Sequence, residues 1–132
     1  MTFFLDANII SYLLRGDDRL KAVIADKLLQ GDKVKIPRVA YYEVKRGLLS
    51  CGATAKMNRF MNWASLLGTV SLTDNTLEIA AQIYADLSQK GSIIEDDDIF
   101  IGATALEHNA TLITNNENHL GRIPNLKIEN WM

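Results

Sequence analysis

The chain has 132 residues, a mass of 14.7 kDa and a formal net charge of −2, with 48% hydrophobic and 23% charged residues. This composition is typical of a folded domain with its own core, and it argues against disorder and low-complexity linkers. No apolar run reaches the roughly 18 residues that span a bilayer, and the N-terminus carries no basic region before its apolar segment. The single cysteine excludes an intrachain disulfide and a multi-cysteine zinc site. We therefore expect one domain over residues 1–132, located in the cytoplasm and without a membrane partner.

The small net charge conceals an asymmetry between the two halves of the chain. Residues 1–66 hold 11 basic and 6 acidic side chains, a net +5, whereas residues 67–132 hold 3 and 10, a net −7. Such a division is a weak indication of nucleic-acid binding, because folding mixes the two halves in space.

Short apolar runs alternate along the chain with segments of helical apolar spacing. In the first half of the chain, the pattern predicts a strand at 2–5, a helix at 7–14, a helical stripe over 20–29 that ends at Gly31, a strand at 34–37 and helices at 38–49 and 53–67. In the second half, it predicts a strand at 69–72, a helix at 75–89 capped by Thr73-Asp74, and a helix from 95–98 to about 108. A strand at 110–114, a polar loop at 115–119 and a last strand at 126–128 follow.

Alternating strands and helices favour a three-layer α/β fold with a mainly parallel central sheet and right-handed crossovers. Ligands of such sheets bind at the carboxyl ends of the strands, beside a topological switch point. Asp6 and the segment after Thr114 are both expected at such ends.

Acidic side chains occur at several positions that this layout can bring together. Asp6 follows the first strand, Glu43 lies inside a helix among apolar neighbours, and Asp96–Asp98 start another helix. Asn116 and Glu117 follow the strand at 110–114. Because like charges a few ångströms apart raise one another's pKa, clustered carboxylates favour a neutralising cation. Their hard oxygen atoms suit Mg²⁺ or Mn²⁺, the ions of metal-assisted phosphodiester hydrolysis.

Each of these positions also has a purely structural interpretation. Asp6 could simply cap the helix that follows it, and Glu43 could lie on a solvated helix face. The acidic run could be an ordinary helix start, where each carboxylate gains a few tenths to about 1 kcal/mol from the helix dipole.

Helical phase distinguishes the members of the acidic run. Asp98, Gly102 and Ala105 share one face, where small residues would leave room for a metal ion and a phosphate. Asp97 lies about 100° away and is expected in solvent. Asp96 precedes or caps the helix and could turn inward as a secondary ligand.

Three sequence blocks resemble those of one nuclease family. They are Leu5-Asp6-Ala7-Asn8, Tyr42-Glu43-Val44-Lys45-Arg46-Gly47 and Asp96-Asp97-Asp98-Ile99-Phe100-Ile101-Gly102-Ala103-Thr104-Ala105-Leu106. Their order and spacing resemble PIN-domain nucleases, and the stretch from Leu112-Ile113-Thr114-Asn115-Asn116 to Trp131 is similar to the tail of the VapC-type toxins in that family. The resemblance covers nearly the whole chain and implies a PIN-like α/β/α fold.

The resemblance also implies a function. Proteins of this type are Mg²⁺- or Mn²⁺-dependent endoribonucleases that hydrolyse phosphodiester bonds of RNA, with tRNA or rRNA as conceivable substrates. They are the toxins of type II toxin–antitoxin pairs, are inhibited by a cognate VapB-type antitoxin, and commonly form homodimers.

By position, Asp6, Glu43 and Asp98 match the catalytic, metal-binding acids of the family. Many relatives carry an Asp two residues after the Thr that ends the late strand, and here that residue is Asn116, a neutral and weaker ligand. Glu117 or Asp96 could supply the missing charge, or Asn116 could act through water. This departure leaves open whether the site holds one metal ion or two.

Other polar residues are secondary candidates. Asn8 could position water or phosphate, and the Thr114 hydroxyl could touch the acidic cluster. His108 and His119 are expected to have structural roles. Four basic residues are candidates for contact with RNA phosphates, with ordinary solvated charge as the alternative: Arg15, Arg38, Lys45 and Arg46.

Two apolar stripes, Met57/Phe60/Met61 and Leu66/Leu67, fit either a core or, as the resemblance implies, an antitoxin groove. Phosphoacceptor receiver domains and haloacid-dehalogenase-type phosphatases are disfavoured, because neither of their Asp patterns is present. The remaining rival is a PIN-fold module that binds RNA or protein without cleavage, which the neutral Asn116 would permit.

Overall fold

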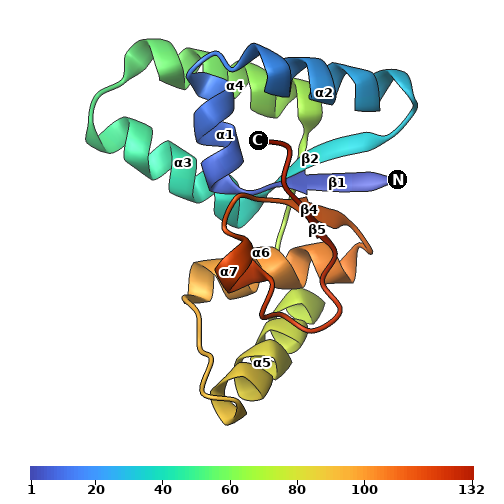
Figure 1. The fold of residues 1–132 in the computed structure, drawn as a ribbon. Helices are drawn as coiled ribbons and strands as arrows, with labels where there is room; N and C mark the ends of the chain where they lie inside the picture. The colour runs from blue at the N-terminus through green and yellow to red at the C-terminus, as the bar shows by residue number, and fades with distance from the viewer.

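The computed structural model describes all residues 1–132 and contains one five-stranded sheet (Figure 1). Its strands are β1 (Thr2–Leu5), β2 (Lys33–Pro37), β3 (Thr69–Val70), β4 (Thr111–Ile113) and β5 (Ile128–Glu129). They lie in the order β3-β2-β1-β4-β5, and every pairing is parallel. The predicted α/β fold with a parallel sheet is therefore confirmed.

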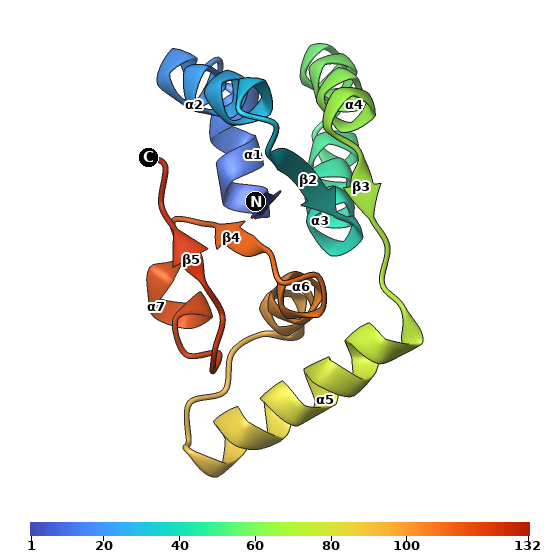
Figure 2. The ribbon, with the colours of Figure 1, turned by 90° about the vertical axis from the view of Figure 1, so that its right-hand side faces the viewer.

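Helices cover both faces of the sheet, as Figure 2 shows, with α2 and α4 on one side and α5 and α6 on the other. The helices are α1 (Ala7–Leu14), α2 (Asp18–Leu29), α3 (Arg38–Ser50), α4 (Thr54–Leu67), α5 (Asp74–Gln89), α6 (Asp96–Glu107) and the short α7 (Glu117–Leu120). Helix α3 contacts α1, α4 and α6, so it joins the two sides at one end of the sheet. None of these helices has the length and apolarity that crossing a membrane requires.

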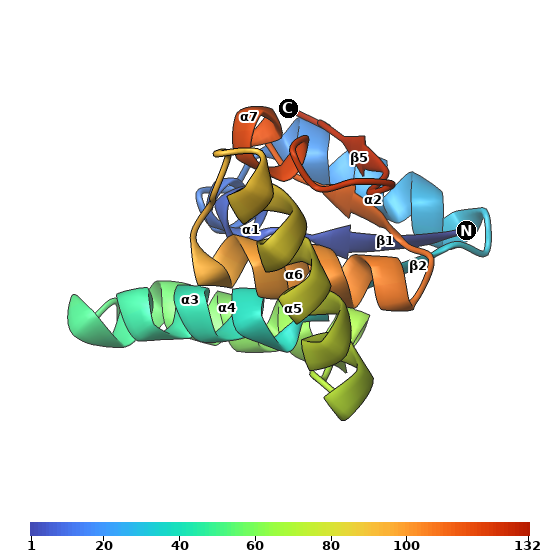
Figure 3. The ribbon, with the colours of Figure 1, turned by 90° about the horizontal axis from the view of Figure 1, so that it is seen from below.

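Helix α6 is the most deeply embedded helix, with residues 101–105 all buried. It lies between the sheet and α5 (Figure 2), and the view from below in Figure 3 shows α5 crossing in front of it, so it has no continuous solvent face along this stretch. This burial on all sides explains why residues 99–106 of the helix are small or apolar around its whole circumference, without the one-sided pattern of a surface helix.

The small residues of α6 do not leave the open space that the helical phase suggested. A Cβ atom on Gly102 would lie 2.4 Å from Cδ1 of Ile123 and 3.5 Å from Cδ2 of Leu126. Ala105 is likewise fully buried. The expectation of room for metal and phosphate beside Gly102 is therefore wrong, because the C-terminal segment packs there.

The remaining differences from the expected elements are local. Residues 117–120 form α7 where a loop was expected, with the Leu120 N–H donating to the Asn116 carbonyl. The third strand ends at Val70 and not at residue 72, because it pairs only with Ile36 and Pro37 at the end of β2. The last strand is shifted to Ile128–Glu129.

The sheet has its topological switch point at β1, whose neighbours β2 and β4 follow it in opposite directions across the sheet. Leu5 pairs with Ile113, so the next residues, Asp6 and Thr114, leave the sheet side by side at its carboxyl edge. This is the edge at which parallel α/β sheets bind ligands.

Candidate functional site

Asp6 lies at the carboxyl end of β1 and is 4% exposed. Its Oδ1 accepts a hydrogen bond from the Ala7 N–H at 2.7 Å, and its Oδ2 accepts one from the Thr114 hydroxyl at 2.8 Å. Burial raises the pKa of this carboxyl, and the two hydrogen bonds oppose the rise. Asp6 therefore caps α1 and also presents a carboxylate at the sheet edge, so its two interpretations are compatible.

Glu43 projects from α3 toward the same edge and has one carboxylate oxygen without a partner. Its Oε1 is buried and accepts no hydrogen bond. Burial raises the pKa of Glu43 to about 7, with further increases from the charges of Asp97, Asp6 and Asp98, and Arg46 opposes the rise. A buried oxygen without a donor is costly, so this position is suited to a cation.

Asp98 enters the cluster from the first turn of α6 and is half-buried. Burial raises the pKa of its carboxyl, and the charge of Asp6 raises it further. His119 lies on the other side, with Nδ1 3.6 Å from the Asp98 Oδ2. Asp6, Glu43 and Asp98 thus come from three separate segments and influence one another electrostatically, as their positions in sequence led us to expect.

Asp97 is closer to this cluster than its helical phase suggested. Its Oδ2 lies 3.5 Å from a guanidinium nitrogen of Arg46, and it is the largest charge contribution to the raised pKa of Glu43. The expectation that Asp97 only faces solvent is wrong, because α3 packs beside the start of α6 and places Arg46 there.

Two of the secondary acidic candidates lie away from the cluster. Asp96 is exposed and faces α5, where it borders a shallow pocket with Leu77 and Tyr84. Glu117 is exposed and accepts a hydrogen bond from the Asn130 side chain at 2.8 Å. Neither carboxylate is placed to supply the charge missing at Asn116.

The segment after β4 is fixed by Thr114. Its hydroxyl, which donates to Asp6, accepts from the Asn116 N–H at 2.9 Å and from the Asn8 amide at 3.5 Å. The Asn8 Oδ1 in turn accepts from the Asn115 N–H at 3.3 Å. Asn8 and Thr114 therefore orient Asp6 and the following loop, and the Asn116 side chain is directed to His119 at 3.3 Å.

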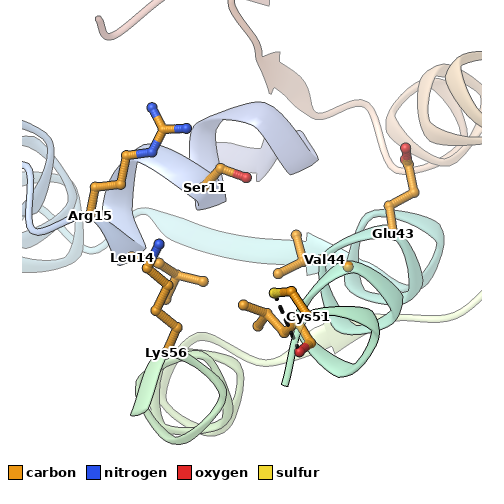
Figure 4. Close-up of a pocket in the computed structure, with 9 residues that line it drawn as sticks. Ser11, Leu14, Arg15, Glu43, Val44, Cys51 and Lys56 are labelled. Atoms are coloured by element: carbon orange, nitrogen blue, oxygen red, sulfur yellow. Dashed lines mark hydrogen bonds between the residues drawn. The ribbon is translucent and has the colours of Figure 1, made fainter. Parts of the chain in front are cut away.

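A cleft of about 240 Å³ opens beside Glu43 between α1, α3 and α4 (Figure 4). Arg15 and Ser11 line it from α1, and Lys56 lines it from α4. No sequence pattern had identified Lys56, because α4 carries no acidic block and its closeness to Glu43 depends on helix packing. Cys51 also lines this cleft, and its thiol contacts the Leu48 carbonyl oxygen at 3.8 Å.

The four basic candidates divide into two groups. Arg15 lies in the cleft and stacks over Tyr12 at 5.3 Å, and Arg46 pairs with Asp97. Arg38 and Lys45 both lie over the Tyr41 ring, at 4.2 Å and 5.4 Å. Because Tyr41 packs on Phe60 of α4, this second pair occupies a face of α3 away from Glu43.

The donor set suits a hard divalent cation, although no three His, Cys, Asp or Glu side chains form a ready-made coordination group. Three carboxylates with raised pKa and one unpartnered buried oxygen are groups that a positive ion would stabilise. Oxygen ligands of this kind favour Mg²⁺ or Mn²⁺.

Comparison with known proteins gives concordant matches. The PIN domain family model matches residues 3–126. Ribonuclease VapC2 of Rickettsia felis is 28% identical over 132 residues, covering 99% of this chain and 98% of that protein. Ribonuclease VapC1 of Haemophilus influenzae is 26% identical with the same coverage.

Solved structures agree with these relatives. VapBC2 from Rickettsia felis, bound to a DNA fragment from its promoter, matches with a TM-score of 0.93 and 27% identity over 100% of both chains. VapBC-1 from nontypeable Haemophilus influenzae matches with a TM-score of 0.87 and 25% identity, covering 99% of this chain and 98% of that one. The resemblance to PIN-domain nucleases of the VapC type is therefore confirmed, and the chain belongs to the PIN domain family.

Proposed function

We propose that this protein is the toxin of a type II toxin–antitoxin pair and that it acts as a divalent-metal-dependent endoribonuclease. The observation that carries the proposal is the convergence of Asp6, Glu43 and Asp98 at the carboxyl edge of the sheet, with the pKa of each raised. The relatives named Ribonuclease VapC and the similar VapBC structures support the same conclusion.

In this proposal Asp6, Glu43 and Asp98 hold Mg²⁺ or Mn²⁺ through carboxylate oxygens. A divalent cation supplies positive charge to the phosphodiester and lowers the pKa of the attacking water. Thr114 and the Ala7 N–H keep the Asp6 carboxylate in one orientation. Asn8 and Thr114 together hold the loop that closes this side of the site.

The RNA backbone lies along the cleft beside Glu43 in this proposal. Arg15 and Lys56 line that cleft and carry charges that can neutralise phosphates. Arg46 joins them when it leaves Asp97. Arg38 and Lys45, on the other face of α3, would contact RNA outside the cleavage site or not at all.

A VapB-type antitoxin is the proposed partner, and α3 and α4 offer it an apolar surface. Phe60 and Leu67 of the two stripes are buried, whereas Met61 and Leu66 are exposed. A shallow groove of about 140 Å³ between Leu48 and Met57 lies at the turn joining the two helices. We also propose a homodimer of this one-domain chain, acting in the cytoplasm.

The test is cleavage of RNA by the purified protein, prepared with its neighbouring gene product and then separated from it. We expect cleavage of tRNA or rRNA with Mg²⁺ or Mn²⁺, loss of cleavage with EDTA, and inhibition when the partner is added back. RNA binding without cleavage under every divalent condition would replace the nuclease by the binding module that Asn116 permits.

A further inference from the structure

His119 lies beside Asp98, three residues after the neutral Asn116. Its Nδ1 lies 3.6 Å from the Asp98 Oδ2 and 3.3 Å from the Asn116 amide nitrogen. The side chain is 43% exposed, so solvent and dissolved ions reach its ring. His119 therefore places a ring nitrogen beside the three carboxylates.

The position of His119 is fixed by the short helix α7. Leu120, which follows it, is fully buried, and the Leu120 N–H donates to the Asn116 carbonyl at 3.1 Å. The turn closes at Gly121, where a Cβ atom would lie 2.6 Å from the Glu117 carbonyl oxygen. The ring is thus carried by a hydrogen-bonded turn that is anchored in the core by Leu120.

Nδ1 is the nitrogen of the His119 ring that faces the acidic cluster, because it lies near both the Asp98 carboxylate and the Asn116 amide. A neutral imidazole carries its acceptor lone pair on one ring nitrogen, so the tautomer with its proton on Nε2 makes Nδ1 available as a ligand. At 3.6 Å the carboxylate of Asp98 is too far for a direct hydrogen bond. Two donor atoms about 2.1 Å from a common ion lie roughly 3.0 to 3.5 Å apart, close to this separation.

We propose that His119 is a nitrogen ligand of the cation site and shifts its preference from Mg²⁺ toward first-row transition ions such as Mn²⁺, Co²⁺ or Fe²⁺. Imidazole nitrogen suits these ions better than Mg²⁺, which favours oxygen. This inference rests on the proposed metal site. Because Nδ1 has a single lone pair, a bound cation takes the place of the Asn116 amide in contact with this nitrogen.

The direct test is pulsed EPR of Mn²⁺ bound to the full-length protein after chelator treatment. We expect an imidazole ¹⁴N coupling in the wild type that disappears in His119→Gln. Titration calorimetry with Co²⁺ and Mg²⁺ supplies a second readout, in which His119→Gln lowers Co²⁺ affinity about tenfold or more and changes Mg²⁺ affinity less than twofold. His119→Glu should instead raise Mg²⁺ affinity.

His108 is the matched control, because it is the only other histidine and lies at the opposite end of α6. His108→Gln should retain the ¹⁴N coupling and the wild-type ratio of Co²⁺ to Mg²⁺ affinity. Circular dichroism and thermal unfolding confirm that each variant folds.

Two results would overturn the inference in distinguishable ways. Mn²⁺ bound without ¹⁴N coupling, and with an unchanged affinity ratio in His119→Gln, would reduce His119 to a partner of Asp98 and leave the nuclease proposal intact. Failure of the wild type to bind any divalent cation would overturn both proposals.

Discussion

The two ends of helix α6 carry carboxylates in opposite circumstances. Asp98, at the N-terminal end, is half-buried among other carboxylates, and burial together with Asp6 raises its pKa. Glu107, at the C-terminal end, accepts hydrogen bonds from Thr76, Thr73 and Asn75, which lower its pKa. The surroundings of Asp98 therefore disfavour its ionised form, whereas those of Glu107, on the same helix, favour the ionised form.

This difference indicates that Glu107 has a structural role and Asp98 a functional one. The donors around Glu107 come from the capping box of α5, so this carboxylate fastens α5 to α6. Asp98 has no such set of donors, and the carboxylates of Asp6, Glu95 and Asp97 repel its charge. Sites that store unfavourable electrostatics of this kind are maintained for function and reduce stability.

The largest expected effect is the loss of cleavage in Asp98→Asn. Because loss of residues that only support metal ligands already costs about 10- to 100-fold, we expect RNA cleavage to fall by about 100-fold or more. The same change removes a repelled charge, so the free energy of unfolding without metal should rise by about 1 kcal/mol. Gel-based cleavage assays and urea unfolding in EDTA provide the two measurements.

Glu107→Gln is the matched carboxylate from the other end of α6. It should retain wild-type cleavage and lose about 1 kcal/mol of unfolding free energy, because its hydroxyl and amide donors lose an anionic partner. The comparison fails if Glu107→Gln loses cleavage or if Asp98→Asn is the less stable of the two variants.

The middle of α6 allows a test of how tightly this helix packs against the C-terminal segment. Gly102→Ala places a Cβ atom against Ile123, so we expect overpacking to exceed the gain in helix propensity and to cost about 1 kcal/mol. Gly47→Ala in α3 meets no atom within 4 Å and should gain about 0.5 to 1 kcal/mol. Equal stabilisation of both variants in urea unfolding would show that Ile123 moves aside freely.

Glu43 gives a smaller, pH-dependent effect on stability. Its pKa in the folded protein is about 7, against 4.5 as the ordinary value, so the folded state holds the extra proton between these limits. Unfolding free energy should therefore fall as the pH rises from 4.5 to 7. Because Glu43 is half-exposed and screened by solvent, we expect a fall of about 1 to 2 kcal/mol that Glu43→Gln removes. Urea unfolding of both proteins at pH 5 and pH 8 in EDTA measures this fall. An equal change in unfolding free energy between the two pH values in the wild type and in Glu43→Gln would contradict the prediction.

The fold was predictable because its determinants are local. Apolar runs at 2–5 and 34–37 and helical stripes such as 75–89 indicate elements whose alternation permits little besides a parallel α/β sheet. Helix α7 was missed because four residues are too few to show periodicity, and its turn depends on Gly121 fitting against Glu117.

The site was predictable in part for a similar reason. Asp6 follows a strand directly, so its place at the sheet edge follows from the topology. The positions of Asp97, Lys56 and His119 depend on how α3, α4 and α7 pack, which no spacing within one helix reveals. Gly102 was misinterpreted because its partner, Ile123, lies 21 residues further along the chain.

Substitution of Asp97 has the smallest expected effect, and it tests whether adjacent carboxylates have different roles. Asp97 adjoins Asp98 in sequence but contacts Arg46. Asp97→Asn releases Arg46 toward the RNA and removes the strongest repelling charge on Glu43. The lost ion pair is partly exposed and screened by solvent, so the free energy of unfolding should change little.

We expect Asp97→Asn to leave kcat within about threefold of the wild type and to lower KM, because a freed guanidinium strengthens phosphate binding while the metal-binding carboxylates stay in place. Arg46→Gln should raise KM, and adding it to Asp97→Asn should remove the gain. Steady-state cleavage over a range of RNA concentrations separates kcat from KM. A loss of kcat comparable to that of Asp98→Asn would instead make Asp97 part of the metal site, and the contrast between adjacent carboxylates would disappear.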